Sequence, residues 1–256
     1  MSDYPLFEQD LDEPGVFEAS HFHRPQDVPP VAVLCFFNDL LDDLAAEGRL
    51  TPLYTLRSEI GLNPVYKLSL PEGEVCVVHP GVGAPLAAGF LEETAALGVT
   101  TFVAVGGAGA LDTSLALGHP MVVTSALRDE GTSLHYLAPS RTIDADPLGV
   151  EVLSRYLDEH DEPYLVGRAW TTDGLFRETK SRVARRIGED CVMVDMEASA
   201  LMAVARYRGF RLAHLLYAGD MVAGDEWDGR AWDKARGTRE HLFTLAAGAA
   251  LALHRA

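Results

Sequence analysis

The sequence is poor in lysine and in positive charge. Its 256 residues carry 21 basic side chains against 38 acidic ones, a net charge of −17, and the lysines are only Lys67, Lys180 and Lys234. A surface with this negative excess repels polyanions, which argues against nucleic acid and anionic membranes as partners. A small anionic substrate would need a local positive site against the same field.

Long apolar runs are also missing. The longest stretches, such as 245–253, are too short to cross a bilayer. The first 25 residues are acidic and lack the basic-then-apolar order of a signal peptide. We therefore expect a cytoplasmic protein that makes no contact with a membrane.

Cysteine is scarce and unpatterned. Cys35, Cys76 and Cys191 are odd in number, lie among apolar neighbours and show no CxxC spacing. Buried free thiols are the simplest interpretation. The sequence offers no metal site and no disulfide framework.

What is present is an alternation of short apolar runs with helical patterns. Residues 1–30 are polar and contain prolines, which predicts an N-terminal arm, and 31–256 form one domain. The expected strands are 31–37, 75–79, 101–106, 121–126, 164–170, 191–196 and 211–219. The expected helices are 84–98, 146–160, 178–188, 197–209 and 232–255. This order predicts an α/β fold, a three-layer α/β/α single domain with a mixed, mostly parallel central sheet.

Two glycine-rich segments follow two of these strands. Gly81 and Gly83 precede a helix, where backbone N–H groups can approach an anion or a sugar hydroxyl. Gly106 and Gly107 follow the strand at 101–105, so both loops would open on one crevice. Tight turns and close helix packing would explain the same glycines. Neither segment has the third glycine of a dinucleotide-binding motif, since Leu86 stands in that place after Gly81.

Two acids interrupt an apolar run in "VDMEASAL" (194–201), where a strand passes into a helix. A carboxylate there can accept hydrogen bonds from the hydroxyls of a ribose, and it can stabilise positive charge on the sugar ring. The alternative is that one acid caps the helix while the other is solvated.

"VDMEASAL", followed by "LLYAGD" (215–220), resembles the nucleoside phosphorylase superfamily, the purine nucleoside and uridine phosphorylases and their hydrolytic relatives. "PGVGAPLAAGFLEE", "VAVGGAGALD", "VVTSALRDEGTSLHY" and "WTTDGLFRET" stand in the order of that family. The resemblance implies a nucleoside phosphorylase-like fold and a homo-oligomer, either a dimer or a trimer of dimers. It requires no cofactor, with phosphate as a possible co-substrate.

The resemblance assigns roles to four residues. Met196 and Glu197 match a pair that binds the ribose, and Asp195 stands beside them where an acid is common. Asp220 matches the acid that protonates a departing purine, because a purine anion leaves poorly until N7 is protonated. The alternative for Asp220 is a turn residue after a strand.

The segment 170–179 corresponds to the base-binding loop. Phe176 and Leu175 could stack on the base, while Arg177 and Glu178 could read its edge. The Gln-x-Arg pair with which uridine phosphorylases recognise uracil is missing from 178–182, which favours a purine over uridine. His21 and His23 of the arm could correspond to a histidine that a neighbouring subunit lends to the 5′-hydroxyl.

The phosphate-binding side departs from the family. The segment 35–39 has no basic residue and no glycine, Ala104 stands where an arginine is usual, and Gly107 replaces a Thr or Ser. Arg57 is the candidate for the arginine donated across the dimer. Other arginines could rebuild an anion site, namely Arg128, Arg141, Arg168 or Arg177.

We therefore expect an enzyme that cleaves the N-glycosidic bond of a nucleoside, with phosphate or water as the nucleophile. The products would be the free base and ribose 1-phosphate or ribose. One alternative is a phosphate-independent nucleosidase. Another is a non-catalytic protein that binds or senses a nucleoside.

Overall fold

The computed structural model describes residues 4–8 and 10–256. The strands are β1 (Val31–Cys35), β2 (Leu50–Ser58), β3 (Gly61–Leu70), β4 (Gly73–Val78), β5 (Thr101–Ala110), β6 (Pro120–Asp129), β7 (Thr142–Asp144), β8 (Leu165–Thr172), β9 (Cys191–Asp195) and β10 (Arg211–Met221). The α-helices are α1 (Asn38–Ala46), α2 (Ala84–Ala96), α3 (Pro147–Glu159), α4 (Lys180–Ile187), α5 (Ala198–Arg208) and α6 (Arg236–Arg255).

All strands belong to one sheet in the order β10-β6-β8-β9-β5-β1-β4-β3-β2, with β7 paired to β6. An additional pairing joins β10 to β5, so β10, β6, β8, β9 and β5 close into a ring. Strand β10 is therefore paired on both sides, with β5 in parallel and β6 antiparallel. The closed part of the sheet brings the ends of β5, β9 and β10 together.

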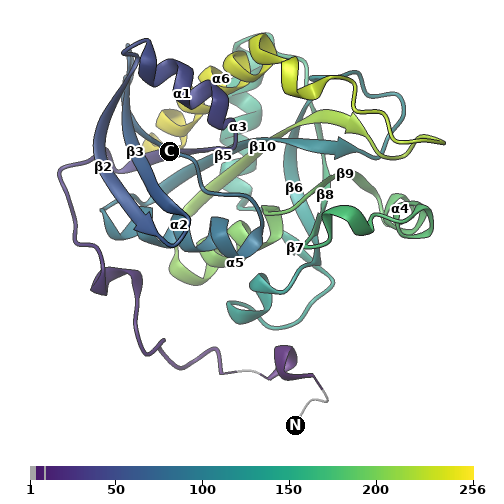
Figure 1. Cartoon of the computed structure of the whole chain (residues 1–256), viewed down its shortest axis with the longest axis horizontal. Helices are drawn as coiled ribbons and strands as arrows, with labels where there is room; N and C mark the ends of the chain where they lie inside the picture. The colour runs from purple at the N-terminus through teal and green to yellow at the C-terminus, as the bar shows by residue number, and fades with distance from the viewer. Residues whose placement is uncertain (1–3, 9) are drawn as a thin grey trace.

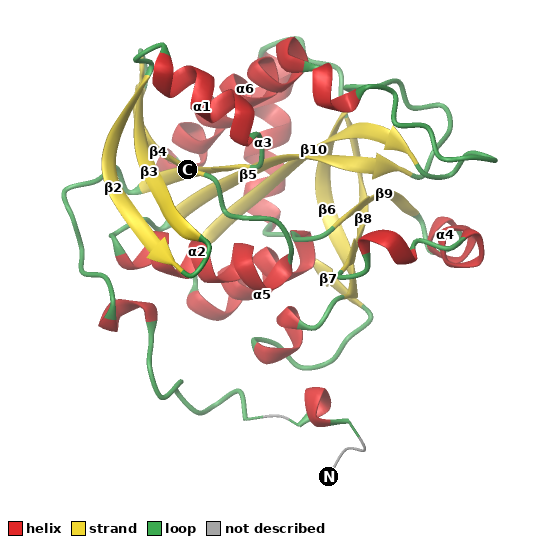
Figure 2. Ribbon diagram, viewed as in Figure 1, coloured by secondary structure: helices red, strands yellow, loops and turns green. Residues whose placement is uncertain are grey.

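Helices cover both faces of the sheet, as Figures 1 and 2 show: α1, α3 and α6 lie on one side and α2 and α5 on the other. Two apolar clusters correspond to these faces. Val103 and Leu215 pack toward α3 and α6, whereas Phe102 and Leu212 pack toward α2 and α5. Because strand residues alternate between faces, nearly continuous apolar strands are what a sheet covered on both sides requires.

The predicted α/β/α layering and the mixed sheet are confirmed. The described pairings divide into five parallel and five antiparallel ones. The sequence interpretation missed the β2–β3 hairpin, which adds two antiparallel pairings at one end of the sheet. It also missed α1, a short amphipathic helix directly after β1.

The second predicted glycine loop is part of a strand. Strand β5 runs on to Ala110, and Gly106 and Gly107 pair with Leu216 and Tyr217 of β10. Neighbouring rings occupy the space where side chains would be: a Cβ on Gly106 would lie 3.1 Å from the Phe36 ring, and one on Gly107 would lie 3.2 Å from the Tyr217 ring. Close approach of aromatic rings therefore explains these glycines.

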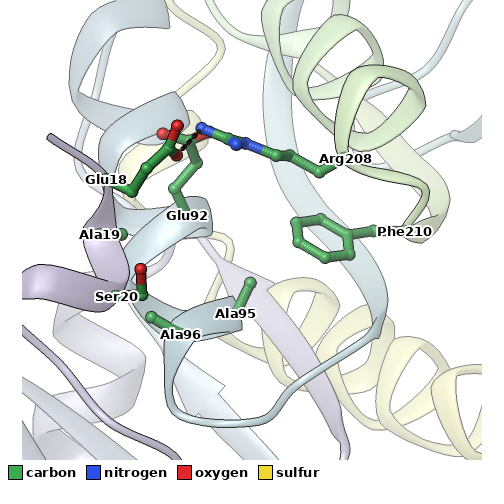
Figure 3. Close-up of a pocket in the computed structure, with 8 residues that line it drawn as sticks. All are labelled: Glu18, Ala19, Ser20, Glu92, Ala95, Ala96, Arg208 and Phe210. Carbon is green, nitrogen blue, oxygen red and sulfur yellow. Dashed lines mark hydrogen bonds and ion pairs between the residues drawn. The ribbon is translucent and has the colours of Figure 1, made fainter. Parts of the chain in front are cut away.

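The described part of the predicted arm lies against its own chain. The short helix Ala19–His21 contacts α2, and Arg208 of α5 pairs with both Glu18 and Glu92 at 2.5 and 2.6 Å (Figure 3). A small hollow of about 180 Å³ remains beside this ion triad. Backbone hydrogen bonds also join the arm to the domain, from Gln26 to Leu97 and from Thr100 and Thr101 to Pro30. The division into an arm and one domain stays a prediction.

Gly149 marks the closest approach of a helix to the sheet. A Cβ on this glycine of α3 would lie 2.4 Å from the backbone oxygen of Leu212 in β10, an atom that cannot rotate away. We expect Gly149→Ala to lower the free energy of unfolding by about 1–3 kcal/mol, measured by urea denaturation. Gly89→Ala in α2 is the matched control, because no atom lies within 4 Å of its Cβ, and it should leave stability unchanged or raise it slightly.

Candidate active site

A cleft of about 940 Å³ opens where β5, β9 and β10 end. Its walls include the segment after β1, the glycine part of β5, the start of α5, the segment 175–183 and the loop after β10. Most of the residues singled out in the sequence line it: Gly106, Gly107, Leu175, Phe176, Glu178, Asp195, Met196, Glu197 and Asp220. The structure therefore brings together side chains that are more than 100 positions apart in the chain.

Glu197 lies at the junction of β9 and α5 and is buried. Its carboxylate accepts a hydrogen bond from the backbone N–H of Gly83 at 2.6 Å and a weaker one from Met196 at 3.3 Å. Gly83 has φ +92°, a conformation that favours glycine, and immediately precedes α2. The first glycine loop is thus in direct contact with the acid, although Gly81 is buried and neither Gly81 nor Gly83 is among the described residues that line the cleft.

The Asp195 carboxylate accepts hydrogen bonds from the backbone at the start of α5. One of its oxygens accepts hydrogen bonds from the N–H groups of Glu197 and Ala198, at 3.1 and 2.6 Å, and the other accepts from the Thr171 hydroxyl at 2.7 Å. A carboxylate at a helix N-terminus satisfies donors that have no partner within the helix. These contacts hold the helix start and Glu197 in place, and a direct ribose contact by Asp195 stays a prediction.

The two carboxyl groups resist ionisation. Burial raises the pKa of both Asp195 and Glu197, and the negative charge of Asp195 raises the pKa of Glu197 further. Burial withdraws water from the charged form, and a second negative charge nearby makes that form less favourable still. A positive charge developing beside Glu197 would reverse this balance and favour its carboxylate.

Asp220 lies near the end of β10, on the cleft wall. Its carboxylate accepts a hydrogen bond from the indole N–H of Trp227 at 2.7 Å, and its backbone oxygen accepts one from Arg230 at 3.2 Å. Trp227 belongs to the loop after β10 and is 68% exposed. The loop therefore folds back over the strand end and orients the acid.

A second acid faces the same end of the cleft. Glu178 is half-buried, and burial together with the charge of Asp220 raises the pKa of Glu178 to about 7. Phe176 and Leu175, which are 91% and 54% exposed, stand at the rim beside it. Arg177 is exposed and does not line the cleft in the part of the chain that the structure describes.

The arginines named as a possible anion site lie elsewhere. Arg57 is exposed on β2, at the far end of the sheet from β10. Arg128 bonds to Ser133 and to nearby backbone oxygens, Arg141 pairs with Glu189, and Arg168 bonds to Ser125 and to the Glu189 backbone. None of these four lines the cleft among the described residues.

One arginine missed in the sequence does line the cleft. Arg239 of α6 is buried, donates to Asp39 at 2.7 Å and lies 4.8 Å above the Phe37 ring. Its position in the middle of a helical pattern gave no local signal. His214, Tyr217, Trp227 and Trp232 also line the cleft and were not singled out, although His214 interrupts an apolar strand in the sequence.

His21 and His23 stay on their own side of the molecule. His23 is buried, with one ring nitrogen 3.4 Å from Glu93 and the other 3.4 Å from the Tyr54 hydroxyl. His21 is exposed and bonds locally to Glu18. Neither histidine lines the cleft of this chain in the described structure, so a contribution to a neighbouring subunit stays a prediction.

In residues 4–8 and 10–256, no three or more His, Cys, Asp or Glu side chains are grouped so that they could hold a metal ion. Within the same residues, every helix is too short or too polar to span a bilayer.

Comparison with known proteins gives consistent similarities. A family profile described as the phosphorylase superfamily matches residues 30–251. A guanosine phosphorylase of Halorubrum lacusprofundi is 28% identical over 202 residues, 76% of this chain and 84% of the relative. A uridine phosphorylase of Thermococcus kodakarensis is 30% identical over 102 residues, 40% of this chain and 37% of the relative.

Solved structures share the fold. A uridine phosphorylase from Vibrio fischeri superposes with a TM-score of 0.73 at 24% identity, covering 90% of this chain and 94% of the other. An AMP nucleosidase from Bacteroides thetaiotaomicron gives a TM-score of 0.70 at 22% identity, covering 90% of each chain. At these identities the similarity establishes the architecture and leaves the chemistry to the site.

Proposed function

The chain belongs to the phosphorylase superfamily, and from that premise we propose that it cleaves the N-glycosidic bond of a purine nucleoside by phosphorolysis. The observation that carries the proposal is the pairing of two acids in one cleft. Glu197 lies at the junction of β9 and α5. Asp220 lies near the end of β10, where the Trp227 indole donates to its carboxylate.

In the proposed reaction the bond between C1′ and the purine nitrogen breaks, and its electron pair goes to the base. The carboxyl group of Asp220 protonates the base at N7, while Glu197 stabilises the positive charge that develops on the ribose and accepts from its hydroxyls. A phosphate oxygen forms the new bond to C1′. The proton that phosphate loses restores the acid, so the products are the free purine and ribose 1-phosphate.

Two features support a purine. Glu178 and Asp220 place two carboxyl groups at the end of the cleft where Phe176 and Leu175 could cover a base, and these groups can donate to and accept from a purine edge. A protein named guanosine phosphorylase is similar over 202 residues, with 84% of its length covered.

Hydrolysis is the second candidate, and the cation content of the cleft favours it. Two basic side chains line the described cleft. Arg239 is already paired with Asp39, and the Lys180 ammonium group donates to the Asp225 backbone oxygen at 2.7 Å. In a protein with net charge −17, a dianion would meet little compensating charge unless another copy supplies it. Water needs no such compensation, and the products would then be the free purine and ribose.

We also propose a homo-oligomer in which Arg57 completes the anion site of a second copy. Arg57 is exposed on β2, whose only described partner strand is β3. Light scattering gives the oligomer size. If the protein is a monomer at working concentration, this part of the proposal is overturned.

The test is chromatography of purine and pyrimidine nucleosides incubated with the protein, with and without phosphate. Free purine together with ribose 1-phosphate, formed only when phosphate is present, would support phosphorolysis. Free purine and ribose without phosphate would support hydrolysis. If no nucleoside releases a base, the proposed function is wrong.

The raised pKa of Glu178 makes a pH-dependent prediction. Burial and the charge of Asp220 raise the pKa of Glu178 to about 7. Below about pH 7 Glu178 is protonated and can donate to the purine edge beside Asp220, and above about pH 7 this donor is lost. We therefore expect kcat for a purine nucleoside to fall as pH rises through about 7.

Replacing Glu178 with Gln removes the group whose pKa is raised to about 7, so the fall in kcat through that pH should be lost. Glu226→Gln, at an exposed glutamate on the same cleft, is the control and should leave the profile in place. A Glu178→Gln profile identical to the wild type would show that Glu178 does not cause the fall.

A further inference from the structure

A buried histidine in the cleft has no hydrogen-bond partner. His214 of β10 is 2% exposed and lines the cleft, and neither of its ring nitrogens bonds to any described residue. Burial lowers the pKa of His214 to about 4, so its ring is neutral at pH 7 and offers one N–H donor and one acceptor.

Burying this ring without a hydrogen-bond partner lowers the stability of the unliganded protein. A buried polar group without a partner forfeits the hydrogen bonds it made to water, and most buried polar groups in folded proteins are satisfied. Its neighbours on the same face of the strand, Leu212 and Leu216, are apolar and buried, so a leucine or phenylalanine would suit the local packing. The imidazole is therefore best explained by a ligand that satisfies it.

The position of the ring identifies the end of the cleft that the ligand occupies. His214 pairs in register with Ala104 of β5, two residues before Gly106. Phe36, which packs on Gly106, lines the cleft at this end. Asp220 lies six residues further along β10, at the end where the base would be protonated.

A displacement at C1′ requires the nucleophile to approach from the face opposite the departing base. The end of the cleft away from Asp220 is therefore the nucleophile side, and the described residues that line it carry few polar side chains. Arg239 donates to Asp39 and lies over the Phe37 ring. Among the described residues of the cleft, the His214 ring is buried with both nitrogens unpartnered, and the Tyr217 hydroxyl and the Arg239 Nε are also buried without a partner.

We propose that His214 binds the oxygen nucleophile of the glycosidic cleavage. The proposal rests on the proposed function and deepens it by assigning a residue to the nucleophile side. Its N–H donates to an oxygen of phosphate, or to the water that replaces phosphate if the reaction is hydrolytic. The ring thereby supplies a hydrogen bond to the nucleophile that Arg57, Arg128, Arg141 and Arg168 of this chain do not supply, because they do not line the described cleft.

Two substitutions separate binding from folding. His214→Phe keeps an aromatic ring of similar size but removes both nitrogens, and it should leave the melting temperature unchanged or raise it, because an unsatisfied polar group is lost. His214→Gln keeps a donor. His254→Gln is the control, since His254 lies on α6, exposed, with its ring 3.1 Å from Thr101 at the start of β5.

The first experiment is steady-state kinetics. Phosphate is varied at saturating nucleoside, and the nucleoside is then varied at saturating phosphate. We expect His214→Phe to raise KM for phosphate by about 10- to 100-fold, with a much smaller change in KM for the nucleoside. His214→Gln should recover part of this loss. If the wild type instead cleaves without phosphate, His214→Phe should lower kcat for hydrolysis by a comparable factor. An unchanged KM for phosphate, or unchanged hydrolysis, overturns the proposal.

The second arm measures binding of inorganic phosphate alone by calorimetry, and it separates this inference from the proposed function. Phosphate binding by the wild type that is lost in His214→Phe supports the site even if no nucleoside is cleaved. If the wild type cleaves a nucleoside and the His214→Phe variant is fully active, the proposed function holds and the assignment of His214 is overturned.

Discussion

Replacing Asp220 with Asn should lower kcat for a purine nucleoside by about 10²- to 10⁴-fold, the usual contribution of a general acid. The amide keeps the shape of the side chain and can still accept the hydrogen bond that Trp227 donates at 2.7 Å. It cannot give a proton to N7, so KM for the nucleoside should change little. Steady-state kinetics at saturating phosphate measures both constants.

A substrate that needs no protonation provides the internal control for Asp220. An N7-methylated purine nucleoside already carries a positive base, which leaves as a neutral molecule. The variant should cleave it at close to the wild-type rate. Asp158→Asn, on the exposed face of α3, controls for the loss of one charge. Equal losses on the methylated and unmethylated substrates would contradict the assignment of Asp220 as the acid.

Replacing Glu197 with Gln should lower kcat/KM by about 10²- to 10³-fold, as the loss of one preorganised electrostatic contact does. The amide oxygen can still accept from the Gly83 N–H, so the loop before α2 should stay in place. What the variant lacks is the negative charge that stabilises the sugar in the transition state. Kinetics on the ribonucleoside and on its 2′-deoxy analogue measure the effect.

The analogue separates two contributions of Glu197. If the carboxylate both contacts the 2′-hydroxyl and stabilises charge, the variant should lose less activity on the deoxynucleoside than on the ribonucleoside. Glu130→Gln is the control, because Glu130 is also buried and accepts from Ser199 of α5 at 2.9 Å but does not line the cleft among the described residues. It should lower stability and leave kcat within a few-fold. An unimpaired Glu197→Gln variant would remove Glu197 from the reaction.

The parts of this structure that the sequence predicted are those with local signals. Buried strands show apolar runs and helices show their period, so the layers and the junction at Glu197 were predictable from the pattern. The resemblance placed Asp220 in the same cleft, which the pattern alone does not do. The β2–β3 hairpin was missed because its strands are only partly buried and contain two prolines, Pro52 and Pro64, which are unusual inside strands.

Residues that act through long-range contacts were not predictable in the same way. Asp195 was expected to face the ribose, yet its oxygens bond to Thr171 and to the start of α5, partners that become visible only when β8 and β9 pair. Arg239 reaches the cleft because α6 returns across the sheet to β1 and β5. Nothing in the helical period of 236–255 distinguishes that face from any other.

The indole of Trp227 gives the cleft an optical property. Of the three tryptophans, Trp170 is fully buried with its N–H bonded to Asp129, while Trp227 and Trp232 line the cleft and are 68% and 42% exposed. Trp227 donates to the carboxylate of Asp220 itself. Emission from the two exposed indoles therefore reports on the acid and on whatever displaces water around it, against a constant background from Trp170. Occupancy of the cleft can be followed in unlabelled protein, on the time scale of a single turnover.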